Sequence, residues 1–158
     1  MLSSFINHDF VNYRKQTFES DRKKFSSSVR SKGQGNIPIV VDSVEEEIAQ
    51  CLTTFTSHGS VSGIELVVHM DCTLHDVLKR VKIHLISNDC EHLMTTELAL
   101  GLEEGTIPDL SSNLGDIYKH YRNKDDKILY ILLTRQQSVY DYIKSILHYL
   151  TVKLKFWT

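Results

Sequence analysis

The residues best suited to chemistry are thiols and imidazoles that lie close together in the sequence. Cys72 precedes His75 across the expected start of a helix, and Cys90 lies two residues before His92. A nucleophilic thiol needs a base within hydrogen-bond reach and a further group that orients the base. Neither spacing is a catalytic signature, so we interpret both pairs as a buried thiol beside a surface imidazole. The sequence predicts no enzyme activity and no catalytic residue.

Eight histidines raise the question of a metal site. None is spaced as His-x-x-x-His, and there is no Cys-x-x-Cys pair to complete a zinc-binding set. Gly33 and Gly35 lack the Gly-Lys-Ser/Thr that would follow in a phosphate-binding loop. We predict neither a metal nor any other cofactor.

Charge is spread unevenly along a chain whose formal net charge is only -2. Residues 1–32 are rich in Lys and Arg, whereas neither occurs from Gly33 to Leu78. The basic end has no aromatic-rich platform beside it, so we predict solvated faces and no nucleic-acid partner. The odd number of cysteines favours free thiols in a reducing compartment. The first residues lack the apolar core of a signal peptide, and no apolar run reaches the ~20 residues of a membrane span.

The fold that positions the residues above is expected to contain a sheet, with the apolar run Ile128–Leu133 at its centre. The run follows a charged turn, is too short for an ordinary helix and is rich in strand formers. Such a run is typical of a strand that is buried on both faces. We therefore place it in the middle of the sheet.

The remaining elements follow from periodicity and capping residues. Ser43 with Glu46, Thr73 with Asp76 and Asn113 with Asp116 are helix-start signals. We expect strands over 36–42, 64–70, 98–102 and 127–134. We expect two helices within 5–32 and further helices over 44–55, 74–85 and 114–121. A loop is expected over 57–63. A strand pair, a helix across the sheet and two more strands is the order of a β-grasp, with its first and last strands parallel and central.

The chain resembles the ubiquitin-like autophagy modifiers, the GABARAP-like proteins, over about residues 8–141. The order and spacing of several short motifs carry the resemblance. The matching segments are Phe18-Glu19-Ser20-Asp21-Arg22 through Val29-Arg30-Ser31-Lys32, Asn36-Ile37-Pro38-Ile39-Val40-Val41, Leu66-Val67-Val68 with Asp71-Cys72-Thr73-Leu74, Lys82-Ile83-His84-Leu85, Gly115-Asp116-Ile117-Tyr118, Asp125-Asp126 with Leu129-Tyr130-Ile131, and Ser138-Val139-Tyr140.

The resemblance implies an α+β fold, a ubiquitin-like β-grasp with two additional N-terminal helices. We expect an N-terminal helical subdomain over 1–35, the β-grasp core over 36–137 and a C-terminal extension over 138–158. It further implies a non-enzymatic adaptor in the cytoplasm and on autophagosomal or vesicle membranes. Family members are attached through a C-terminal glycine to phosphatidylethanolamine, after action by a processing protease and activating and conjugating enzymes. They capture proteins bearing an aromatic-x-x-aliphatic peptide, which adds as a strand to the sheet edge.

The resemblance places the peptide-binding residues on both sides of the edge strand 64–68. One pocket would receive the aromatic side chain and the other the aliphatic one, while flanking cations would attract acidic peptide residues and raise the on-rate. The aromatic pocket would be lined by Val29, Pro38, Val67 and Ile128; the aliphatic pocket by Leu66, Val68, Val77 and Leu78; the cations would be Arg30, Lys32, Arg80 and Lys82. For each apolar residue, plain core packing is the alternative role.

Two departures from the family pattern bear on function. Gly63 and Glu65 stand in the edge strand where the family has lysines, so we expect Glu65 to repel an acidic peptide. Asp141 stands at the conjugation position, and no glycine occurs beyond Gly115. The family enzymes thread a glycine tail through narrow sites where a Cβ clashes, so we expect no lipid attachment by that route.

The C-terminal extension 138–158 combines apolar residues at helical spacing with an alternating basic and apolar end that closes on Trp157. This composition suits a membrane interface. It equally suits a segment docked on the protein's own groove, and an artefact of gene prediction or splicing would also explain it. The rival function is therefore a membrane-associated scaffold that uses this tail without peptide docking or lipid conjugation.

Overall fold

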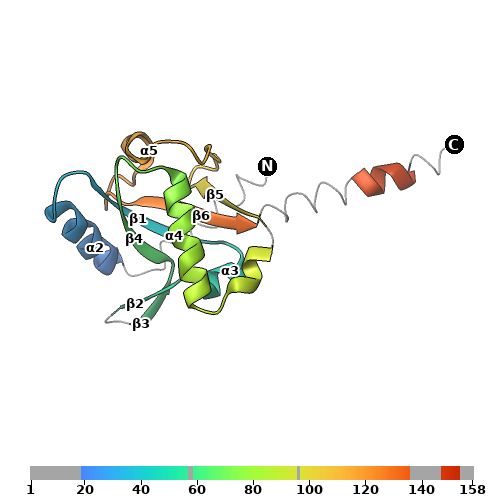
Figure 1. Ribbon diagram of the computed structural model, residues 1–158, viewed down its shortest axis with the longest axis horizontal. Helices are drawn as coiled ribbons and strands as arrows, with labels where there is room; N and C mark the ends of the chain where they lie inside the picture. Colours follow the sequence, from blue (N-terminus) through green and yellow to red (C-terminus); the bar gives the residue numbers. More distant parts are fainter. Residues whose placement is uncertain (1–18, 57–58, 96, 136–146, 154–158) are drawn as a thin grey trace.

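The structure is a computed structural model and describes residues 19–56, 59–95, 97–135 and 147–153. At its centre is a mixed sheet in the order β4-β1-β6-β5 (Figure 1). Its strands are β1 (Asn36–Asp42), β4 (Ile64–His69), β5 (Leu98–Leu102) and β6 (Leu129–Arg135). This is the predicted ubiquitin-like α+β arrangement, in which the first and last strands are neighbours.

β6 occupies the centre of the sheet because its residues are apolar on both faces. Every residue of Ile128–Leu133 is buried. β6 is parallel to β1, with Ile39 opposite Leu129, and antiparallel to β5, with Leu100 opposite Leu133. β4 is antiparallel to β1 on the other side. The predicted central strand and the predicted pairing are both confirmed.

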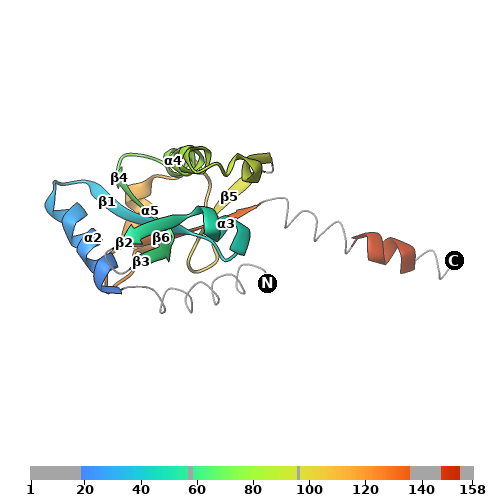
Figure 2. The same ribbon diagram turned by 90° about the horizontal axis from the view of Figure 1, so that it is seen from below.

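Helices pack on the two faces of the sheet. α4 (Leu74–Ser87) lies along one face, as the turned view shows, and its Val77, Val81 and Leu85 are fully buried (Figure 2). α2 (Glu19–Ser31) packs on the other face, where Phe25 contacts a small cluster around Ile128. The expected helix ending near Lys32 is thus confirmed, and the helix expected before it lies outside the described residues.

The predicted capping residues hold the starts of two helices. The Asp76 carboxylate accepts hydrogen bonds from the Thr73 N–H at 2.9 Å and from the Thr73 hydroxyl at 3.2 Å. The Asn113 side chain accepts from the Asp116 N–H at the start of α5 (Leu114–Tyr121). The bonds from the Thr73 and Asp116 N–H groups satisfy backbone donors that a helix start leaves unpaired.

The segment between β1 and β4 differs from the sequence prediction. α3 spans only Glu46–Cys51, and a small hairpin of β2 (Thr53–Thr56) and β3 (Gly59–Ser62) follows in place of further helix and a loop. Ser43 is not the cap of α3. Its buried hydroxyl donates to the Leu133 carbonyl at 2.7 Å, so it joins the end of β1 to β6.

Two of the three cysteines form a disulfide, so the expectation of free thiols is wrong for them. Cys51, at the end of α3, is bonded to Cys90, which follows α4, and their Cα atoms are 6.3 Å apart. Cys72 is free and half-buried. The bond links the hairpin region to the far end of the helix that covers the sheet.

Residues 147–153 form a short helix with an exposed apolar surface. Leu147, Tyr149, Leu150 and Val152 are all exposed. The Lys153 ammonium lies 5.7 Å from the centroid of the Tyr149 ring. Among the described residues, no helix has the length and apolar character needed to cross a membrane.

Candidate functional site at the edge of the sheet

β4 forms a free edge of the central sheet within the described part of the chain, since its ladder partner is β1 alone. The Met70 N–H donates to the Gly35 carbonyl at 2.7 Å, which marks these opposed residues as a bonded pair. Bonded and unbonded pairs alternate along an antiparallel ladder. Val67, opposite Pro38, is therefore in an unbonded pair, and its N–H and C=O point to the outside.

Pro38 fits this register because its ring nitrogen has no hydrogen to donate. It is the third residue of β1, which is a central strand. The strand tolerates it because the pair with Val67 requires no hydrogen bond, and the ladder to β6 begins one residue later at Ile39. The same pairing leaves the Val67 backbone available to an added strand.

The four residues predicted for the aromatic pocket belong to the α2 side of the sheet. Val67 and Pro38 are directly opposed, and Ile128 belongs to the cluster that α2 covers. Val29, Pro38 and Ile128 are buried, while Val67 is 42% exposed. Val67 is thus the member of this group that a ligand can reach without rearrangement.

Phe25 is a neighbour of this group that the sequence analysis left out. It is half-buried and packs against the Ile128 cluster from α2. Its helical spacing with Val29 was the signal that could have placed it on the same face. An aromatic ligand side chain that entered beside Val67 would approach this ring.

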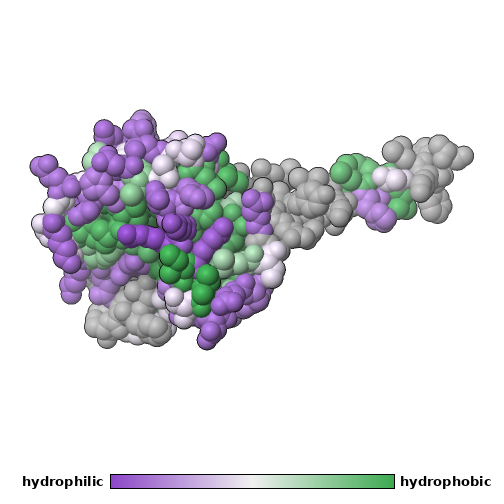
Figure 3. Space-filling model, in the orientation of Figure 1, coloured by the Kyte–Doolittle hydropathy of each residue, from purple (hydrophilic) through white to green (hydrophobic). Residues whose placement is uncertain are grey.

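The residues predicted for the aliphatic pocket lie on the opposite, α4 side. Val68, Val77 and Leu78 are buried in the main core, and Leu66 packs against that core while half-buried. The two predicted groups therefore flank β4 from its two faces. In the space-filling view, apolar surface broken by polar side chains is visible between α2 and α4 (Figure 3).

Arg80 contacts the free edge directly. Its Nη1 donates to the Val67 carbonyl, the outward-facing acceptor described above. Arg80 is exposed on α4 and Lys82 is half-exposed. Arg30 and Lys32, near the other end of the edge, are both exposed, and Arg30 lines a separate pocket beside Tyr118. The four predicted cations therefore lie on both sides of β4.

Glu65 forms an ion pair that the sequence analysis did not anticipate. Arg22 Nη1 lies 3.1 Å from Glu65 Oε2, and the Arg22 side chain is only 6% exposed. Arg22 Nη2 also donates to the Ser62 carbonyl. The charge of Glu65 is thus neutralised from α2, which reduces the repulsion that we expected toward an acidic peptide. The position of Arg22 in the helical repeat with Phe25 was the available signal.

Asp42 completes a buried polar group beneath this ion pair. Its Oδ1 accepts from the Ser43 N–H and from the Ser62 hydroxyl, both at 2.8 Å. Burial raises the pKa of the Asp42 carboxyl, against the lowering effects of these hydrogen bonds and of the Arg22 charge. The arrangement fixes α2, β1 and the start of β4 relative to one another.

Asp141, the predicted conjugation position, lies outside the described residues. Within the described ranges, no group of three or more His, Cys, Asp or Glu side chains is placed to hold a metal ion. In that part of the chain, no hydrogen bond joins Cys72 to His75 or Cys90 to His92. Cys90 is bonded to Cys51 in the disulfide.

Comparison with known proteins bears on the fold. No protein-family model matches the sequence, and no curated protein matches it. A crystal structure of ATG8 from Trypanosoma brucei is similar in three dimensions, with a TM-score of 0.53, 17% identity, and coverage of 78% of this chain and 93% of that one. The likeness establishes the ubiquitin-like fold of ATG8 for this chain.

Proposed function

We propose that this ubiquitin-like chain is an autophagy-related adaptor that captures proteins through an aromatic-x-x-aliphatic peptide at the edge of β4. The observation that carries the proposal is the outward-facing backbone of Val67, placed between apolar groups on both faces of the sheet. The fold shared with ATG8 supports it. The role is one of binding, with no catalytic residue.

The peptide would pair with β4 as an added strand. Its backbone would supply partners for the outward N–H and C=O of Val67, and its alternate side chains would point to opposite faces. The aromatic residue would go toward Val67 and Phe25, and the aliphatic residue toward Leu66. Because Val29 and Ile128 are buried, full entry of a large ring requires side-chain movement on the α2 side.

Arg80 would have to release the Val67 carbonyl before a peptide could bond to it. The guanidinium would then be free to pair with an acidic residue of the peptide, so the exchange replaces one contact by another. Lys82 lies on the same helix, and Arg30 and Lys32 lie on the other side of the edge. These exposed cations would act chiefly on the association rate.

Membrane attachment through phosphatidylethanolamine is not part of the proposal. Asp141 replaces the glycine that the family's protease and conjugating enzymes require, so we propose that these enzymes do not act on the chain as written. We propose a cytoplasmic location, with recruitment to autophagosomal or vesicle membranes through bound partners.

The test is a calorimetric titration of the full chain with a Trp-x-x-Leu peptide. We expect Val67→Arg to weaken binding at least about tenfold, because a charged side chain would occupy the approach to the aromatic group. Ile107→Arg is the matched control, since Ile107 is also exposed and lies in the loop after β5. Absence of binding, or equal binding by both variants, would sink the proposal.

A second function is supported by the apolar surface of the helix over 147–153. Its four exposed apolar residues and Lys153 suit the interface of a membrane, so the chain would act as a membrane-associated scaffold. Co-sedimentation with anionic vesicles, comparing the full chain with one that ends at Tyr140, tests this function. Equal sedimentation of the two chains would show that the tail is not the anchor.

A further inference from the structure

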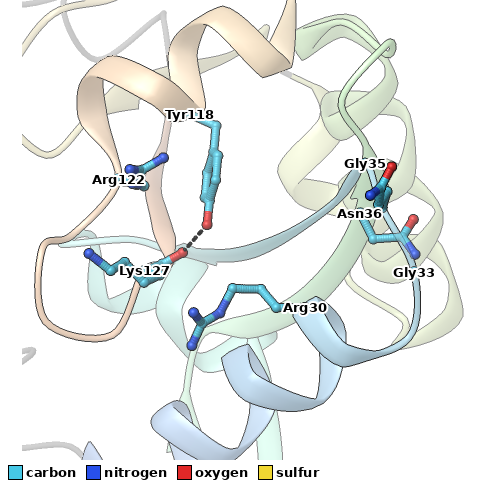
Figure 4. A pocket seen from close by; sticks show the side chains of 8 residues that line it. Arg30, Gly33, Gly35, Asn36, Tyr118, Arg122 and Lys127 are labelled. Atoms are coloured by element: carbon cyan, nitrogen blue, oxygen red, sulfur yellow. Dashed lines mark hydrogen bonds between the residues drawn. The ribbon is translucent and has the colours of Figure 1, made fainter.

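A separate pocket of about 370 Å³ lies where α2, α5 and the segment before β6 meet. Arg30 reaches it from the last turn of α2, Arg122 from the end of α5, and Lys127 from the turn before β6 (Figure 4). The loop over 33–36 closes the side opposite these cations. Three basic residues from three different segments thus line one space.

Tyr118 holds the cationic side of the pocket in place. Its hydroxyl donates to the Lys127 carbonyl at 2.7 Å (Figure 4). The Arg122 guanidinium lies over its ring, 5.3 Å from the centroid, which is a cation–π distance. The half-buried Tyr118 side chain therefore contacts the Arg122 guanidinium and the Lys127 backbone.

No carboxylate lines the pocket, and in the described part of the chain none of the three cations forms an ion pair. The carboxylate of Asp126, near Tyr118, already accepts from the Ile128 N–H and the Tyr130 hydroxyl.

Burial raises the pKa of Tyr118, while the charges of Arg122 and Arg30 oppose that rise. Both arginines therefore act electrostatically on the same phenol oxygen.

The opposite wall consists of backbone and amide groups. Within the described ranges, the N–H groups of Gly33 and Gln34 have no hydrogen-bond partner in the protein. The side chains of Gln34 and Asn36 add neutral donors and acceptors. The pocket thus combines a cationic side with a side suited to hydroxyl groups.

We propose that this pocket binds a phosphorylated polyol of the inositol phosphate class. Arginine binds phosphate oxygens with two parallel hydrogen bonds, and lysine adds a point charge. The polyol hydroxyls would face Gln34, Asn36 and the loop N–H groups. The volume is at the small end for ligand sites, which suits one phosphorylated ring. The ligand would be a free metabolite or a lipid headgroup, since both present the same chemistry.

The test measures the melting temperature and the binding heat of the full chain with inositol trisphosphate, at ionic strength matched with KCl. We expect a rise in melting temperature, because a ligand that binds the folded chain stabilises it. Arg122→Gln and Arg30→Gln should each weaken binding about tenfold. Lys119→Gln is the matched control, since Lys119 is exposed on α5 but does not line the pocket, and its affinity should be unchanged.

Arg30 and Arg122 also lie near the carbonyl ends of α2 and α5, where positive charge stabilises a helix. If that were their whole role, Arg122→Gln would lower the melting temperature and inositol trisphosphate would have no effect. No response to inositol trisphosphate beyond that to uncharged inositol, or equal affinities of Arg122→Gln and Lys119→Gln, would overturn the proposal.

Vesicles that contain phosphatidylinositol 4,5-bisphosphate distinguish the two sources of the ligand. Vesicle binding that soluble inositol trisphosphate displaces identifies a headgroup, and binding of the soluble compound alone identifies a free metabolite. Either result supports the pocket. Arg122, unlike Arg30, is not among the residues proposed for peptide docking, so Arg122→Gln should still bind the Trp-x-x-Leu peptide.

Discussion

Where α2 contacts the sheet, a buried charge and close packing occur together at a few residues. Arg22, almost fully buried, pairs with Glu65 and lies near the carboxylate of Asp42. Gly63 passes over this group with a φ of 103°, a left-handed conformation that favours glycine. The position of β4 relative to α2, and hence of the candidate docking edge, depends on these contacts.

Asp42→Asn should change how stability depends on pH. Because burial raises the pKa of Asp42 in the folded chain, the native state binds this proton more tightly than the unfolded state does. Stability in the original chain should therefore fall as pH rises from the unfolded pKa, near 4, through the folded pKa, by up to about 1.4 kcal/mol per pH unit.

An asparagine oxygen can keep both hydrogen bonds that Asp42 accepts, so the Asp42→Asn variant should fold. Its stability should lack the pH-dependent contribution of the Asp42 carboxyl. Urea unfolding of the two chains from pH 4 to pH 8 measures the difference. A difference in unfolding free energy between the two chains that stays constant across that pH range would contradict a raised pKa of Asp42 in the folded chain.

Gly63→Ala should destabilise the fold by about 1–3 kcal/mol. A Cβ at this position would lie 3.2 Å from both Arg22 Nη2 and Val40 Cγ1, in addition to the strained φ. Gly59→Ala is the matched control, because Gly59 also has positive φ but its Cβ would meet no atom within 4 Å. Thermal unfolding should show a larger loss for Gly63→Ala, and equal losses would show that packing contributes nothing.

Among the elements, those with a regular pattern of their own were predictable from the sequence. β6 was found from its apolar run, and α4 from its spacing and the Thr73–Asp76 signal. The β2–β3 hairpin was missed because Phe55 continues the helical spacing of Ile48 and Leu52, so local periodicity favoured a helix. Ser43 was misassigned because its partner, the Leu133 carbonyl, is 90 residues away in sequence.

The candidate site was predictable in its layout and not in its contacts. The resemblance assigned Leu66 and Val67 to different pockets, and the alternation of side chains along β4 puts them on opposite faces. The burial of Val29 and Ile128, the Arg80 contact with the Val67 carbonyl and the Arg22–Glu65 ion pair depend on packing between distant segments. No spacing in the sequence encodes those contacts.

The Cys51–Cys90 bond should stabilise the segment between β1 and β4. It closes a loop with a sequence separation of 39, for which the loss of chain entropy in the unfolded state amounts to about 4 kcal/mol as an upper estimate. Cys51→Ser should lower the free energy of unfolding in urea toward that of the reduced chain. Cys72→Ser, the control, should leave the effect of reductant intact, and an original chain insensitive to reductant would contradict the prediction.

On the scale of the whole molecule, the sheet order links both ends of the described core. β1 follows α2 near the start and β6 ends the core at Arg135, yet they are adjacent and central. The helix over 147–153 is drawn beyond the β6 end of the sheet, away from α2 (Figure 1). This apolar helix is therefore separate from the candidate docking edge and the cationic pocket, which have Arg30 in common.

A chain that ends at Lys127 should not fold. Without β6 the sheet would be divided, and the apolar residues of β1 would lose one of their two neighbouring strands. Far-ultraviolet circular dichroism and gel filtration of this shortened chain should show an unfolded or associated species. A cooperative thermal transition in it would show that β6 is not required.

The central position of β6 also determines the order of assembly during synthesis. β1 can pair with β4 once about seventy residues exist, but its other edge must wait until the chain has been extended through Arg135. Closing such a long loop is slow, because its entropy is lost before the strand contacts form. Throughout that interval the nascent chain presents an unpaired apolar strand edge, which is the kind of surface that aggregates unless a chaperone shields it.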